Sequence, residues 1–126
     1  MEFAFHLVAP ERRVFAGEVQ QVDLPGCEGD FGVLAEHAPF VTVLRAGVVR
    51  AHGGDLPPHF LRGGFAEVSA SGLTVLGRGL TPLDELRGDA LDEAVREATA
   101  ALEDAHGEAR RKEQTQILEA LQALSR

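Results

Sequence analysis

Hydrophobic and polar residues alternate along the first two thirds of the chain. In residues 2–8, Phe3, Phe5 and Leu7 are each separated by one smaller or polar residue. Comparable runs, bounded by turns rich in Gly, Pro and Asp, occur at residues 19–24, 40–44, 47–52 and 64–77. Alternation with a period of two turns one face of each strand toward a core. Short strands separated by frequent turns therefore predict an antiparallel sandwich or barrel.

All seven phenylalanines lie in this part of the chain, and the sequence contains no Trp or Tyr. Aromatic side chains bury large apolar areas. We therefore expect much of the β-sandwich core to come from Phe3, Phe5, Phe15, Phe31, Phe40, Phe60 and Phe65.

The spacing of apolar residues changes after Leu80. Thr81 and Pro82 are typical of a helix start, with Thr as the cap and Pro at the first helical position. Gly88 is expected to end this short turn, and Asp89 to cap a longer helix. In that helix the spacing of four and three residues is found at Leu91, Val95, Ala98, Leu102 and Ala105.

A second helix is expected after a break at Gly107. Its apolar face consists of Ile117, Leu118, Leu121 and Leu124. The sequence thus predicts an α+β fold, in which an N-terminal antiparallel β-sandwich, residues 1–82, precedes a C-terminal α-helical hairpin, residues 83–126.

The predicted hairpin has few apolar residues to hold it in place. Each helix is close to the length below which an isolated helix is marginal in water. A buried Leu or Val contributes about 1.5–3 kcal/mol, whereas ordering one residue costs roughly 1–2 kcal/mol. We therefore expect a weakly held hairpin that is able to exchange one docking surface for another.

Composition narrows the function classes. The net charge is −8, and both predicted units are acidic: residues 1–82 hold six basic and nine acidic residues, and residues 83–126 hold six and eleven. Nucleic-acid binding requires a basic surface, and neither unit has the excess of basic residues that would form one. No apolar run is as long as the roughly 18–20 residues of a membrane span. The start of the chain also lacks the basic segment of a signal peptide, so we expect the protein to stay on the cytosolic side.

The segment from Pro25 to Pro39 combines turn residues with ionisable ones. Glu28, Asp30 and His37 are residue types that could form an acid–base site. Catalysis, however, also requires a nucleophile or a metal and a pocket that excludes water. We expect no catalytic residues. The histidines lack the spacing of a metal site, so we expect no bound metal. The alternative is a tight loop, shaped by its glycines, that displays Glu28 and Asp30 at one end of the sandwich.

A basic run, Arg110-Arg111-Lys112, stands out in the acidic tail. As a solvated helix face it needs no function. As a contact for an acidic partner surface, it would increase specificity and association rate more than affinity.

A collinear set of residues carries a family resemblance. Residues 25–47 follow the pattern P-G-x-x-G-x-x-G-V-L-x-x-H-A-P-x-x-T-x-L-x-x-G, and residues 63–77, GGFAEVSASGLTVLG, resemble the next block of the same family. The match covers nearly all of residues 3–77 in order. On these residues the chain resembles the ε subunit of the F-type ATP synthase.

The resemblance implies a β-sandwich of about ten strands, a two-helix hairpin and a non-catalytic role in the central stalk. The implied partners are the γ subunit and the c-ring, and proton flow would be coupled to rotation at the cytoplasmic face of the bacterial inner membrane. By resemblance, Asp30 matches the acidic position that contacts the c-ring, and Glu28 and His37 are expected at the same interface.

The resemblance also implies a regulatory role for the hairpin. In many bacterial members the helices extend from a compact state into the catalytic α/β head and block ATP hydrolysis. Arg110, Arg111 and Lys112 are the candidate contact with an acidic segment of the head. The second helix is polar in its first half and ends soon after Leu124, which leaves inhibition an open question.

ATP is a further implied ligand, because some members bind it through an Ile/Leu-Asp-x-x-Arg-Ala motif. Residues 83–88, LDELRG, match all but the last position. Asp84 and Arg87 are the candidate ATP-binding residues, and Arg87 with Arg110 or Arg111 would hold the phosphates. The alternative is a solvated turn on which Arg87 pairs with the neighbouring acids.

Two rival functions remain open at this point. A nucleotide-sensing regulatory protein of the same fold would bind ATP stably without a γ partner. A small β-fold enzyme would require a deep pocket that joins His37 to Glu28 or Asp30.

Overall fold

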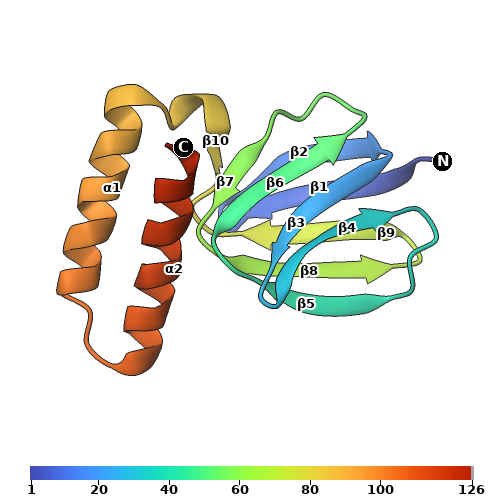
Figure 1. The fold of residues 1–126 in the computed structure, drawn as a ribbon. Coiled ribbons are helices and arrows are strands. Elements are labelled where there is room, and N and C mark those ends of the chain that lie inside the picture. The colour runs from blue at the N-terminus through green and yellow to red at the C-terminus, as the bar shows by residue number, and fades with distance from the viewer. Residues whose placement is uncertain (126) are drawn as a thin grey trace.

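The structure, a computed structural model, describes residues 1–125. Ten strands are followed by a one-turn 3-10 helix and two α-helices (Figure 1). The strands are β1 (Phe3–Ala9), β2 (Arg12–Val19), β3 (Gln21–Gly26), β4 (Gly29–Leu34), β5 (Phe40–Leu44), β6 (Gly47–His52), β7 (His59–Leu61), β8 (Gly64–Ser69), β9 (Gly72–Gly77) and β10 (Thr81–Pro82). The helices are η1 (Leu83–Glu85), α1 (Gly88–Glu103) and α2 (Glu108–Leu124).

The strands form one curled β-sandwich, which confirms the predicted α+β class. Neighbouring strands follow the order β10-β7-β6-β3-β5-β8-β9-β1-β2, and β4 pairs with β3 outside this path. All pairs are antiparallel except β1 with β9, which are parallel. The two helices lie side by side against one end of the sandwich, and the N-terminus lies on the opposite side of the molecule (Figure 1).

The phenylalanines contribute unequally to the core. Phe5 is fully buried, whereas Phe3, Phe15, Phe31 and Phe40 pack against the core from partly buried positions. The prediction was wrong for Phe65, whose side chain is 47% exposed. Its neighbour Ala66 and the next residue of the same parity, Val68, are buried instead, and alternation then turns Phe65 outward.

The hairpin has its own apolar cluster, separate from the sandwich core. Phe60 and Ala46 of the sandwich lie in it together with buried residues of both helices. The buried helix residues are Leu91, Ala94, Ala98, Ile117 and Leu121. Only two buried sandwich residues therefore belong to the contact that holds the hairpin, in keeping with the expected weak docking.

The start of the helical region differs from the prediction. Thr81 and Pro82 form the short strand β10 instead of a helix start, and the Thr81 hydroxyl donates to the Gly79 carbonyl at 3.2 Å. Gly88, with φ of 57°, begins α1 rather than ending the turn, and Asp89 lies in the first helical turn with no side-chain cap. A glycine adopts this left-handed backbone without steric cost, which allows the chain to enter the helix after Arg87. The predicted break at Gly107 is confirmed.

Candidate functional site

The tip of the β3–β4 hairpin carries the acidic residues predicted at an interface. Gly26 pairs with Gly29 across the hairpin, and Glu28 lies exposed in the turn between them. A Cβ at Gly26 would lie 2.5 Å from the Gly29 carbonyl oxygen, so only glycine fits there. The segment expected to be one tight loop is thus a hairpin tip followed by strand β4.

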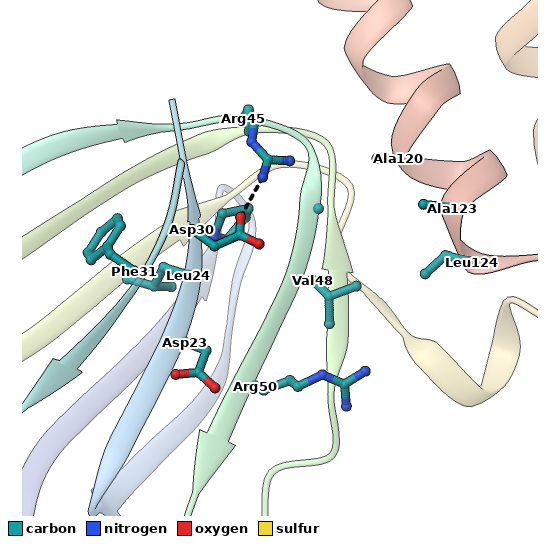
Figure 2. A pocket seen from close by; sticks show the side chains of 12 residues that line it. Asp23, Leu24, Asp30, Phe31, Arg45, Val48, Arg50, Ala120, Ala123 and Leu124 are labelled. Carbon is teal, nitrogen blue, oxygen red and sulfur yellow. Dashed lines mark hydrogen bonds and ion pairs between the residues drawn. The ribbon is translucent and has the colours of Figure 1, made fainter. Parts of the chain in front are cut away.

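Arg45 fastens this tip to the segment between β5 and β6. Its guanidinium forms an ion pair with Asp30 (Figure 2). The same side chain donates from Nε to the Gly26 carbonyl at 3.1 Å and from Nη1 to the Ala46 carbonyl at 3.3 Å. Asp30 is therefore partly neutralised. Glu28 has no cationic partner within 4.0 Å among residues 1–125.

His37 lies at the other end of β4. Its ring contacts Phe40 edge to face at 5.0 Å, and it lines a cavity of about 380 Å³ with Glu36 and Glu2. Glu28 and Asp30 line a different cavity. Asp30 is the second residue of β4, so the other four residues that follow in the strand, at about 3.3 Å per residue, and two further residues separate it from His37. The structure therefore does not bring the three predicted residues into one acid–base group.

A groove separates the sandwich from the end of α2. Its volume is about 540 Å³, and four charged side chains, Asp23, Asp30, Arg45 and Arg50, line its sandwich side. Ala123 and Leu124 of α2 form part of the opposite wall, facing Val48 (Figure 2). The end of α2 therefore leaves space above a polar surface, and this part of the docking contact is loosely filled.

A small polar network borders this groove. His52 Nε2 lies 2.7 Å from Asp23 Oδ2, and Gln21 Nε2 donates to Asp23 Oδ1 at 2.6 Å. The hydrogen bond from His52 is the main cause that lowers the pKa of Asp23 below its ordinary 3.8, against an opposing effect of burial. Asp23 is thus held as a carboxylate.

The basic run lies in the first turn of α2, near the free end of the hairpin (Figure 1). Arg111 Nη1 donates to the Leu102 carbonyl at 3.2 Å, close to the end of α1. Arg110 and Lys112 are exposed and make no side-chain hydrogen bond within residues 1–125. Arg111 thus supports the hairpin itself, which the sequence pattern did not indicate.

The candidate ATP-binding residues, Asp84 and Arg87, lie at the opposite end of the hairpin from the basic run. Asp84 is in η1 and Arg87 directly precedes α1. The 16 residues of α1 span roughly 24 Å at 1.5 Å per residue, so Arg87 and Arg110 or Arg111 cannot hold the same phosphates in this arrangement. The expected pairing of Arg87 with its neighbouring acids is also not among the ion pairs of the described chain.

An exposed apolar stripe was not identified from the sequence. Val41 and Val43 of β5 and Phe65 of β8 are 67%, 62% and 47% exposed, and Val43 pairs directly with Phe65. In the run FVTVL four of the five residues are apolar, so the pattern did not tell which face of β5 is buried. A contiguous exposed apolar patch indicates a protein–protein contact.

Within residues 1–125, no group of three or more His, Cys, Asp or Glu side chains is arranged to hold a metal ion. None of the helices described is long and apolar enough to cross a membrane.

The matching family model and the most similar relatives point to the same protein family. Residues 2–82 match the family model described as "ATP synthase, Delta/Epsilon chain, beta-sandwich domain". The ATP synthase epsilon chain of Parvibaculum lavamentivorans is 41% identical over 122 residues, which are 95% of this chain and 92% of the relative. The epsilon chain of a Bradyrhizobium species is 47% identical over 84% of this chain and 79% of its own length.

Two solved structures share the fold over 98% of this chain. A chain of the Euglena gracilis mitochondrial ATP synthase, in an OSCP/F1/c-ring assembly, superposes with a TM-score of 0.76 at 26% identity, over 79% of its own length. A chain of the Tetrahymena thermophila mitochondrial ATP synthase central stalk and c-ring superposes with a TM-score of 0.75, over 96% of its length. The second is only 12% identical, so it bears on the fold alone.

Proposed function

Because this chain belongs to the ATP synthase delta/epsilon family, we propose that it is a non-catalytic central-stalk subunit of a bacterial F-type ATP synthase. It binds the γ subunit and the c-ring and thereby couples proton translocation to ATP synthesis. It acts at the cytoplasmic face of the inner membrane, as a peripheral part of the complex. The similarity to an epsilon chain over 95% of the sequence is the observation that carries this proposal.

We assign the β3–β4 tip to the c-ring. Glu28 and Asp30 project there on a turn that Arg45 holds in place, and an acidic, preorganised tip suits a polar partner loop that carries cations. His37 belongs to a different contact, because it lies at the other end of β4. The exposed stripe of Val41, Val43 and Phe65 suits an apolar contact with the γ subunit.

We assign the hairpin to regulation of ATP hydrolysis. Its docking on the sandwich depends on buried Phe60 and Ala46, on partly buried Val48, and on an ion pair at 3.9 Å between Arg78 and Glu113. A docking contact of this size is compatible with a second, extended state, since a modest difference in contacts moves such an equilibrium. In the extended state Arg110 and Lys112, already exposed, meet the acidic surface of the catalytic α/β head.

ATP as a regulatory ligand would have to bind at the base of the hairpin. Asp84 and Arg87 are exposed there, but the basic run is about 24 Å away along α1. The compact arrangement therefore supplies fewer cations for phosphates than the motif alone suggested, and we propose no separate nucleotide-sensing function.

The proposal is tested by reconstitution. Membranes depleted of their own epsilon subunit are supplied with this chain, and ATP-driven proton pumping is measured by quenching of a pH-sensitive dye. We expect pumping to be restored only when the chain is added, while the isolated chain hydrolyses no ATP. Failure to bind the cognate γ subunit in size-exclusion chromatography would overturn the proposal.

A further inference from the structure

Strand β5 leaves one backbone edge largely unpaired. On one side it pairs with β8 over all five residues, but on the other side it meets β3 only where Leu44 pairs with Gly26. Strand β4 pairs with β3 alone. From the Gly26–Leu44 pair, β4 and β5 therefore diverge, and a cavity of about 470 Å³ lies between them. We call it the β4–β5 groove; its lining includes Glu28, Asp30, Phe31, Phe40, Val41 and Thr42.

The hydrogen bonds at the closed end of the groove show which backbone groups point into it. The Cys27 N–H donates to the Val43 carbonyl at 3.3 Å, and the Arg45 N–H donates to the Pro25 carbonyl at 2.9 Å. Backbone groups of residues two apart along a strand point to the same side. The N–H and C=O of Val41 therefore point into the groove, where the pairing with β3 no longer extends. Those of Thr42 point toward β8.

The groove combines an apolar floor with an acidic mouth. The rings of Phe31 and Phe40 contact each other edge to face at 5.9 Å. Val41, on the rim, is 67% exposed and continues into the stripe with Val43. Asp30 is paired with Arg45, but Glu28, also part of the lining, has no cationic partner among residues 1–125. An unpaired edge beside apolar side chains is the arrangement to which extended segments of other chains add as strands.

We propose that the β4–β5 groove receives an extended segment of the γ subunit, which pairs with the edge of β5 as an added strand. Apolar side chains of that segment cover Phe31 and Phe40. The inference rests on the proposed function, because it names the place and mode of the γ contact. Val41 joins the groove to the exposed apolar stripe that we assign to the γ subunit, whereas a second copy of the chain, with its net charge of −8, would be repelled.

The test separates the backbone of Val41 from its side chain. Val41→Pro removes the N–H that points into the groove, and an edge position tolerates proline because the bonds to β8 are kept. Val41→Ala removes most of the side chain but keeps the N–H. We expect the Kd for the cognate γ subunit to rise about five- to tenfold for Val41→Pro, the loss of roughly one hydrogen bond, and clearly less for Val41→Ala.

Amide hydrogen exchange in the wild-type chain gives an independent readout. The Val41 amide is expected to exchange rapidly in the free chain and to become protected in the γ complex. The Thr42 amide, directed to β8, serves as the internal control and is expected to be protected in both states. This measurement decides the matter even if Val41→Pro does not fold, which circular dichroism would reveal.

Each outcome has one meaning. If the wild-type chain does not bind γ at all, the proposed function fails. If it binds γ, but Val41→Pro binds equally well and the Val41 amide stays exposed, only the added-strand inference is overturned. Protection of Val41 at high concentration without γ, together with dimers in sedimentation, would assign the groove to a second copy and would also overturn it.

Discussion

Arg45 joins the β3–β4 tip to the neighbouring strands through one side chain. It makes the ion pair with Asp30 and the two hydrogen bonds to the Gly26 and Ala46 carbonyls. We expect Arg45→Ala to lower the free energy of unfolding by about 1 kcal/mol, because two carbonyls lose a charged donor in a partly solvated place. Asp30→Asn, the matched variant, keeps both carbonyl contacts and is expected to cost less, since an exposed ion pair contributes little. Urea denaturation measures both; a larger loss for Asp30→Asn would contradict this assignment.

The stability of the fold also depends on pH through Asp23. The hydrogen bond from His52 lowers the pKa of Asp23 below 3.8 in the folded state. A lowered pKa contributes stability that is fully present above the unfolded value, 3.8, and is lost as the pH falls through the folded value. Asp23→Asn is therefore expected to reduce stability at pH 6, by less than about 1 kcal/mol because the pair is exposed. The difference from wild type should shrink below pH 3.8. A difference that does not change with pH, in melts from pH 2 to 7, would assign it to packing.

At the scale of the elements, the basic run divides into residues with different roles. Arg111 donates to the Leu102 carbonyl near the end of α1, where a cation also interacts favourably with the helix dipole. Arg111→Ala is therefore expected to loosen the hairpin by about 0.5–1 kcal/mol, visible as faster amide exchange in the last turn of α1. Arg110→Ala removes the same charge without that contact and is expected to leave the exchange unchanged. Equal effects of the two variants would mean that charge alone matters.

The sequence predicted these elements where one physical signal dominated. The hydrophobic pattern located β1, β3, β5, β6, β8 and β9, and the glycine at 107 separated the two helices. The same pattern did not reveal β4, because the glycines at positions 29 and 32 interrupt the alternation of apolar and polar residues in that strand. Because β4 was not predicted, His37 was expected beside Asp30, although most of that strand lies between them. The face of β8 on which Phe65 lies, and the carbonyl to which Arg111 donates, depend on tertiary packing, which the local sequence pattern does not encode.

At the scale of the whole molecule, two apolar clusters of unequal size divide the chain. The sandwich cluster contains 13 buried residues, whereas the hairpin cluster has seven, of which only Ala46 and Phe60 come from the sandwich. Truncating Leu121, which is fully buried, would cost about 2–5 kcal/mol in a rigid core. Here the hairpin is able to undock instead. We therefore expect Leu121→Ala to increase amide exchange across α1 and α2 while the sandwich amides and the main melting transition change little.

The same division leads to the decisive prediction about regulation. The chain and a version ending at residue 82 are each added to the cognate catalytic head with its γ subunit, and ATP hydrolysis is measured at saturating subunit concentration. Since the assigned γ and c-ring contacts all lie in residues 1–82, both are expected to bind γ with similar affinity. Only the full chain is expected to lower hydrolysis, because only it carries the hairpin. Leu121→Ala should then inhibit more strongly than wild type, since it weakens the docked state and raises the population able to extend. Equal hydrolysis with both bound forms would instead leave a stalk subunit whose hairpin stays docked.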